Sequence, residues 1–234
     1  MSVQNHADKV VFTLAFRSDK PVDGYLLRLL PDQSPELLIK RRPVLTAGAK
    51  PLSGITVMLD PGHGGTALGA LGPLGAALPE KQMTLAIARE VKRELEARGA
   101  RVLMTRQVDR DVSLEARLEM SRQALPDLFL SIHINSLAST ADASRTTGVV
   151  ALYKDGFGGR FAEKLYKDYA ADLGSKKSGL RWQNLYVCRG YWTPSALLEC
   201  GFLSQPSEFE WLSSEAGRQD IAQAVAASVT SYFE

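Results

Sequence analysis

Residues 55–65 read ITVMLDPGHGG, an apolar run that ends in a turn rich in proline and glycine. A short apolar run bounded by such residues is typical of a buried β-strand. Helix and strand patterns then alternate along the chain: a helix over 81–98, a strand in 101–106, a helix over 113–124 and a strand over 128–135. This alternation predicts an α/β fold, in which helices pack on both faces of a mostly parallel sheet.

The remainder of the chain extends the same pattern. We predict a strand from Val149, a helix around residues 161–173, strands near Leu185 and Ser195, and a last helix with apolar residues from Ile221 to Phe233 at helical spacing. The prediction is therefore a single domain with a twisted sheet of about six strands flanked by helices.

The first 53 residues differ in pattern from the rest of the chain. Short β-like runs begin near Val10, Gly24 and Glu36, and turn-forming residues separate them. Small residues and a proline then interrupt the pattern over residues 47–53, AGAKPLS. We predict a small β-rich N-terminal appendage with its linker over residues 1–53 and the main domain over residues 54–234.

Composition excludes several classes of protein. The chain has 234 residues, and 28 basic residues against 26 acidic ones give a formal charge of +2, too little to attract nucleic acid. No stretch approaches the roughly 20 apolar residues of a membrane span, and no secretory signal opens the chain. Two cysteines cannot form a disulfide scaffold; one bridge and two free thiols both remain open. Because no surplus apolar stripe suggests an interface, we expect a monomer.

Two of the three histidines, His63 and His133, follow or end predicted strands, at the edge where open α/β sheets form their binding crevices. Alone, each has an ordinary interpretation, as a turn histidine and as a hydrogen-bonded core histidine. Glu80 opens the helix after the first strand; it could simply face the positive end of that helix. Together, two imidazoles and one carboxylate make a three-ligand set for one Zn²⁺ ion, with Asp60 expected to orient a histidine.

Glu199 is the fourth candidate. It lies in SALLECGFLS, an apolar strand that carries one acid near its end. Burying a carboxylate there is costly unless it has a role, either in a structural ion pair or in catalysis. A carboxylate beside a metal could take the proton of a water molecule and pass it to a leaving group.

Four segments, LDPGHGG, LPEKQMTLAIA, SIHIN and LLECGFLS, occur in this order, and together they resemble the zinc-dependent N-acetylmuramoyl-L-alanine amidase family, amidase type 3. The resemblance covers about residues 55–233. It implies that His63, Glu80 and His133 bind zinc and that Glu199 is catalytic. Weaker family-like features are Arg106, Arg117 and Ser204. Cys200 and Gln205 depart from the expected pattern without removing a catalytic group, and residues 136–147 are too short and polar for the long inhibitory helix of some members.

The resemblance implies a peptidoglycan hydrolase that cleaves the amide bond between N-acetylmuramic acid and the L-alanine of the stem peptide. Its partner would be peptidoglycan or a muropeptide, outside the cytoplasm, with an export signal missing from these residues; a phage lysin has the same chemistry. Two alternatives are a zinc peptidase that cuts within the stem peptide and an inactive wall-binding module. Tyr191 and Trp192 could line a substrate groove, although ordinary packing is favoured.

Overall fold

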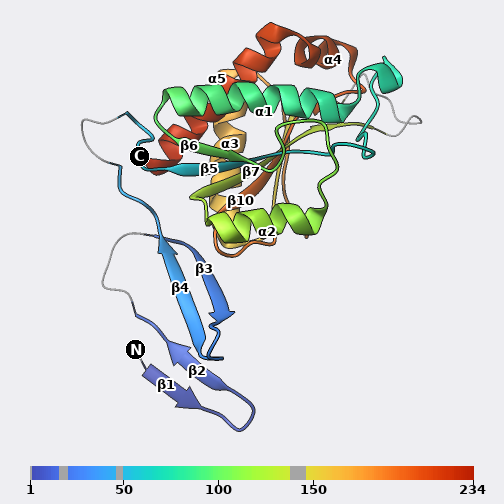
Figure 1. Ribbon diagram of the computed structural model, residues 1–234. Coiled ribbons are helices and arrows are strands. Elements are labelled where there is room, and N and C mark those ends of the chain that lie inside the picture. Colours follow the sequence, from blue (N-terminus) through green and yellow to red (C-terminus); the bar gives the residue numbers. More distant parts are fainter. Residues whose placement is uncertain (1, 16–20, 46–49, 138–145) are drawn as a thin grey trace.

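The computed structural model describes residues 2–15, 21–45, 50–137 and 146–234, and a six-stranded sheet forms its centre (Figure 1). Its strands are, in spatial order, β6 (Arg101–Met104), β5 (Thr56–Pro61), β7 (Leu128–Asn135), β10 (Ser195–Phe202), β8 (Val149–Tyr153) and β9 (Lys177–Trp182). Four neighbouring pairs are parallel, and only β8 with β10 is antiparallel. The predicted α/β class and the mostly parallel sheet of six strands are confirmed.

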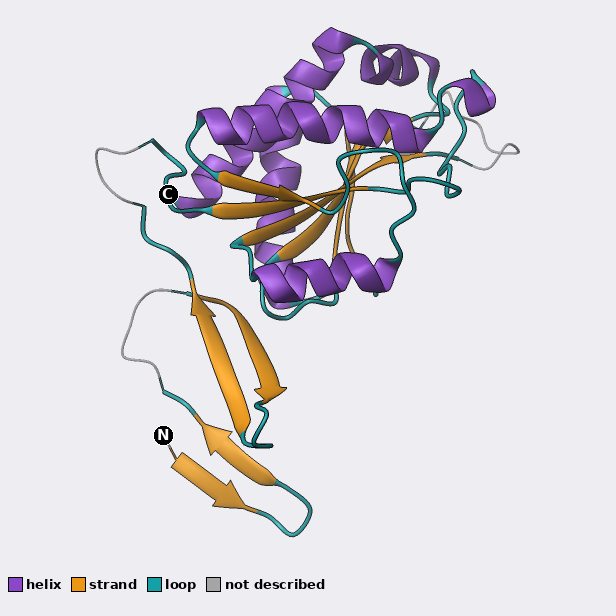
Figure 2. Ribbon diagram, in the orientation of Figure 1, coloured by secondary structure: helices purple, strands orange, loops and turns teal. Residues whose placement is uncertain are grey.

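Helices cover both faces of this sheet (Figure 2). The helices on one face are α1 (Glu80–Ala97), α3 (Gly156–Asp172), α4 (Pro206–Ser213) and α5 (Glu215–Phe233). The apolar side chains of these helices join those of the strands in the larger core, where Ile87, Phe161 and Val225 are fully buried. On the other face, α2 (Leu114–Ala124) and the short 3-10 helix η3 (Tyr186–Cys188) enclose a smaller core.

Pro79 sets the start of helix α1. Pro79 is extended (φ −75°, ψ 159°) and lacks an N–H, so it is tolerated at the start of a helix, and Glu80 becomes the first helical residue. The helix ends before Gly99, whose φ of 96° suits glycine. Glu80 is thereby held at the carboxyl edge of the sheet.

One predicted element is wrong. The chain near Leu185 is not a strand, because residues 186–188 form η3, and the backbone N–H of Cys188 donates to the carbonyl of Leu185. The sixth strand is β9, which pairs parallel to β8. Val187 and Cys188 belong to η3 and are buried in the smaller core, so a helical turn produces the same short apolar run as a strand would.

Two antiparallel hairpins lie outside the main sheet: β1 (Ser2–Asn5) with β2 (Val10–Thr13), and β3 (Val22–Leu29) with β4 (Pro35–Arg41). The second hairpin is tied to the main domain by Asp23, which is 1% exposed and accepts hydrogen bonds from Arg42 and Arg160. Residues 47–49 of the predicted linker lie outside the described residues, whereas Leu52 is fully buried in the larger core.

The two aromatic residues before β10, Tyr191 and Trp192, both contact other side chains of the protein. Tyr191 stacks on Tyr25 of the second hairpin with ring centroids 5.7 Å apart, and the indole N–H of Trp192 donates to Ser121. Cys188 and Cys200 are free, buried thiols. No helix in the described ranges has the length and apolar character to cross a membrane. Of the segment 136–147, residues 138–145 lie outside the described ranges.

Candidate metal centre

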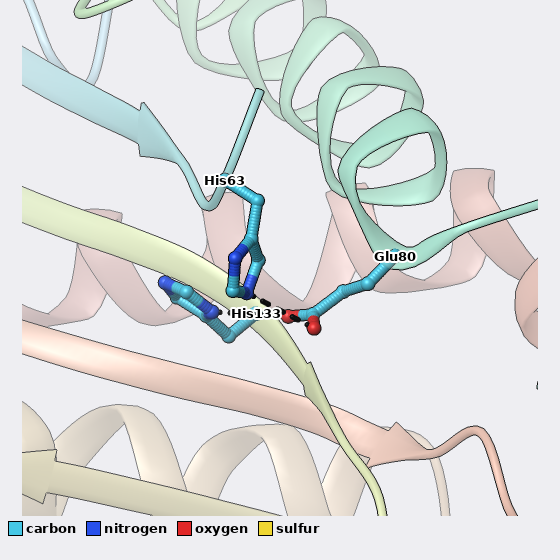
Figure 3. A group of neighbouring side chains, drawn as sticks. All are labelled: His63, Glu80 and His133. Atoms are coloured by element: carbon cyan, nitrogen blue, oxygen red, sulfur yellow. Dashed lines mark hydrogen bonds and ion pairs between the residues drawn. The ribbon is translucent and has the colours of Figure 1, made fainter. Parts of the chain in front are cut away.

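His63, Glu80 and His133 converge at the carboxyl edge of the sheet (Figure 3). They come from three elements: the turn after β5, the first residue of α1, and β7. One candidate ligand atom from each lies within 4.8 Å of the other two. Residues far apart in the sequence are thus brought to one point by the parallel packing of β5 and β7 and by the start of α1 beside them.

The distances suit a small cation. Glu80 Oε2 lies 3.0 Å from His63 Nε2, and Glu80 Oε1 lies 3.0 Å from His133 Nδ1. Two donors on a tetrahedral zinc ion are separated by about 3.3 Å, so these side chains need only small adjustments to share one ion. Burial opposes the charge of Glu80, but hydrogen bonds with the two imidazoles outweigh it and lower the pKa of this carboxyl. The carboxylate of Glu80 is therefore in the charged form that a metal ligand needs.

Two buried arginines hold the turn that carries His63. His63 has a left-handed backbone (φ 62°), which is uncommon outside glycine. Arg117 Nη2 donates to the carbonyl of His63 at 2.6 Å, and Arg106 donates to those of Pro61 and Gly62 at 3.0 and 2.8 Å. Sequence reasoning missed this role of the two arginines. A signal was available for Arg117, because a charge on a helix that packs against the sheet must have a partner once it is buried.

The role expected for Asp60 is wrong. Its carboxylate contacts neither histidine; it accepts hydrogen bonds from Arg117, Thr105 and Ser131 at 2.6 to 2.7 Å. Asp60 lies one residue before the end of β5, so its side chain points to the face of the sheet on which α2 packs. Asp60 therefore holds Arg117 in place, and Arg117 in turn stabilises the turn that carries His63.

We expect the Arg117→Met variant to lose about 3–5 kcal/mol of unfolding free energy, because it leaves Asp60 as an uncompensated buried charge. The side chains of Arg117 and Asp60 are only 4% and 1% exposed. Chemical denaturation measures the loss. A matched control lies on the same helix: Arg122 pairs with Glu119, both more than 40% exposed, and Arg122→Met should cost less than about 1 kcal/mol. Equal losses in the two variants would contradict this account.

Glycine at position 62 is required by close packing. A Cβ there would lie 2.4 Å from Cε1 of His133. Likewise, a Cβ on Gly69 would lie 2.6 Å from Glu80 Oε2, and the φ of Gly69 is 74°. The glycines of this region therefore let backbone approach the ligand side chains directly.

Glu199 lies beside the three ligands. It is paired in register with His133 across β10 and β7. Its side chain is half-buried, and one carboxylate oxygen, Oε2, is buried and has no hydrogen-bond partner among the described residues. Burial raises the pKa of Glu199 to about 7. A buried oxygen without a partner does not fit the expected alternative, a structural ion pair. It instead suits a carboxylate that is free to bind a ligand or a proton.

Two cavities of about 340 Å³ each meet at the histidines, and His63, His133, Leu185 and Leu197 line both. The first, which we term the α2 cavity, is further lined by Val112, Leu114, Arg117 and Tyr186. The second, which we term the Glu199 cavity, is further lined by Glu80, Asn135, Gln183 and Glu199. Sequence reasoning missed the wall from residue 183 to 187, because the apolar run there favours a strand.

Comparison with known families identifies this arrangement. Residues 57–231 match the family model described as N-acetylmuramoyl-L-alanine amidase. The chain belongs to the N-acetylmuramoyl-L-alanine amidase family. Its resemblance in four motifs to amidase type 3 is thereby confirmed.

Individual amidases agree with this assignment. Over 183 residues the chain is 33% identical to the N-acetylmuramoyl-L-alanine amidase LytC of Bacillus subtilis, covering 78% of this chain and 36% of LytC. Among solved structures, the catalytic domain of CwlV from Bacillus (Paenibacillus) polymyxa var. colistinus has a TM-score of 0.70 at 31% identity, covering 76% of this chain and 97% of that one. The amidase AmiC2 of Nostoc punctiforme has a TM-score of 0.71 at 32% identity, covering 77% and 98%.

The chain thus spans only about a third of LytC but nearly all of the two solved amidase chains named above. Members of the amidase family generally depend on zinc, and the donor set of His63, Glu80 and His133 fits this ion: two imidazoles and one carboxylate leave a fourth position for water or substrate.

Proposed function

We propose that this chain hydrolyses the amide bond between N-acetylmuramic acid and the L-alanine of the peptidoglycan stem peptide. The observation that carries the proposal is the unpartnered carboxylate of Glu199 in one cavity with a two-histidine, one-glutamate cluster, in a chain of the amidase family. The proposed substrate is peptidoglycan or a muropeptide released from it.

In this proposal His63, Glu80 and His133 hold one Zn²⁺ ion, and the Asp60–Arg117 pair keeps the His63 turn in position. Zinc, when bound, polarises the scissile carbonyl and lowers the pKa of water to about 7. The three side chains supply one negative charge in total, from Glu80, so the bound ion keeps a net positive charge for the reaction.

Glu199 is the proposed general base and general acid. Its carboxylate takes a proton from the attacking water, whose oxygen forms a bond to the lactyl carbonyl carbon. The carbon–nitrogen bond then breaks, and Glu199 passes the proton to the leaving nitrogen. The first products are a lactyl carboxylic acid, which retains the second proton of the water, and a stem peptide with a free L-alanine amine. The acid then loses that proton to the amine or to solvent and becomes a carboxylate, so all atoms of one water molecule are accounted for.

The organisation of the chain is also a proposal. Residues 54–234 form the catalytic domain, with Leu52 as part of its core, and residues 1–53 form an appendage with its linker. LytC is an N-acetylmuramoyl-L-alanine amidase by name, and this chain would act on the same bond of the cell-wall polymer, outside the cytoplasm. We propose that it acts as a monomer.

The first experiment identifies the bond. The 234-residue chain, loaded with zinc, is incubated with purified peptidoglycan, and the new ends are determined by mass spectrometry. We expect intact stem peptides with free L-alanine amines, abolished by a chelator and restored by added zinc. New amines on any later stem residue would instead show a peptidase, and no release from any wall tested would favour a binding module.

A further inference from the structure

The two cavities that meet at the histidines imply a direction for the substrate. Resting on the proposed amidase function, we infer that the Glu199 cavity receives the stem peptide and that the α2 cavity receives the N-acetylmuramoyl group. Residues Gln183 and Leu114, one on each side, would then select the two halves of the substrate. Three features of the cavity walls support this direction.

First, the shared walls locate the scissile bond. His63 and His133 line both cavities, and so do Leu185 and Leu197. An amide that reacts at the histidines therefore has one cavity on either side. Its carbonyl carbon carries the lactyl-muramoyl group and its nitrogen carries the peptide, so the two halves leave the reaction centre in different directions.

Second, Glu199 decides which half lies on which side. It lines one cavity and is absent from the walls of the other. To protonate the leaving nitrogen, its carboxylate must come within about 2.6–3.2 Å of that atom. The nitrogen, and the L-alanine attached to it, consequently lie toward the Glu199 cavity.

Third, the chemistry of the walls agrees with this direction. The Glu199 cavity is bordered by Asn135, Ser136 and Gln183, whose amides and hydroxyl match the hydrogen-bonding groups of a peptide backbone. The side-chain amide of Gln183 is exposed and makes no hydrogen bond within the described parts of the chain. The α2 cavity instead presents Leu114 and Tyr186, apolar surfaces on which the C–H faces of a sugar ring and its acetyl methyl can pack.

The test compares rate ratios between substrates in two surface variants. Gln183→Ala should lower the ratio of kcat/KM for N-acetylmuramoyl-tripeptide to that for N-acetylmuramoyl-L-alanine by about fivefold, the value of one hydrogen bond. Leu114→Ala should leave this first ratio unchanged. It should instead lower, by about fivefold, the ratio of kcat/KM for N-acetylmuramoyl-tripeptide to that for D-lactoyl-tripeptide, which lacks the sugar. Leu114 is 50% exposed and Gln183 is exposed, so both variants should fold. Gln223→Ala and Leu27→Ala, at exposed positions that line neither cavity, are the matched controls.

Calorimetric binding of the free stem tripeptide to the zinc-loaded protein gives a readout independent of turnover. We expect Gln183→Ala, but not Leu114→Ala, to weaken it about fivefold. The inference is overturned if the two variants exchange their effects, which is the opposite direction, or if neither changes any ratio or affinity. Wild-type protein that binds the tripeptide through Gln183 but cleaves a different bond would instead contradict the proposed function alone.

Discussion

Glu199→Gln is expected to lower kcat/KM on muropeptide by about 10²- to 10⁴-fold, the usual contribution of a general acid–base group. Glutamine keeps the size and the planar shape of the side chain but can neither accept the proton of water nor deliver it to the leaving nitrogen. The carboxylate is available for this role because Oε2 is buried without a partner among the described residues. Steady-state kinetics with a defined muropeptide measures the loss.

Two further measurements separate catalysis from damage to the site. Glu199→Gln should still bind one zinc per chain, because the proposed ligands are other residues. Glu210→Gln, an exposed acid on α4, should retain wild-type kcat/KM. If Glu199→Gln lost zinc together with activity, Glu199 would be a ligand; if it kept full activity, another group would be the base.

His133→Ala is expected to weaken zinc binding by more than about 100-fold, beyond the 10- to 100-fold typical of residues that merely orient a ligand. The variant removes one of three donors that lie within 4.8 Å of one another. It also leaves the carboxylate of Glu80 with one imidazole partner in place of two. Competition with a chromophoric chelator measures the affinity, and activity should be lost in parallel.

The chain supplies its own control for this result. Of its three histidines, His6 is exposed in the turn between β1 and β2, far in sequence from the cluster. His6→Ala should bind zinc as tightly as the wild type. Wild-type affinity in His133→Ala, or an equal loss in His6→Ala, would contradict the proposed ligand set.

Most of the elements, and the placement of the histidines and Glu80 at one edge of the sheet, could be predicted from the sequence because local patterns carry them. The apolar strand of residues 55–61 and the alternation of strands with helices predict a parallel sheet, and in such a sheet the carboxyl ends of neighbouring strands meet at one edge. His63 and His133 stand at those ends, and Glu80 begins the helix that returns from the first strand. The proximity of the histidines and Glu80 could therefore be predicted.

The partners of buried groups could not be predicted, because they come from segments far apart in sequence. Asp60 meets Arg117 across 57 positions, where the sequence suggested a histidine. Asp23 meets Arg160 across 137 positions, and this contact ties the second hairpin to the main domain. Such pairs depend on how α2 and α3 pack on the sheet. Because an unpaired buried charge is costly, a charge that this packing buries needs an opposite charge as its partner.

The sequence by itself determined the fold class, the order of elements from β5 to α3 and the residue types at the reactive edge, since these follow from periodicity and from turn-forming residues. Only the tertiary structure decided that residues 186–188 form a helical turn, that Gly62 lets the ring of His133 approach, and that two cavities flank the cluster. The physical reason is that a short apolar run satisfies burial equally well as a strand or as a helical turn, whereas a cavity is the space left after all the elements have packed.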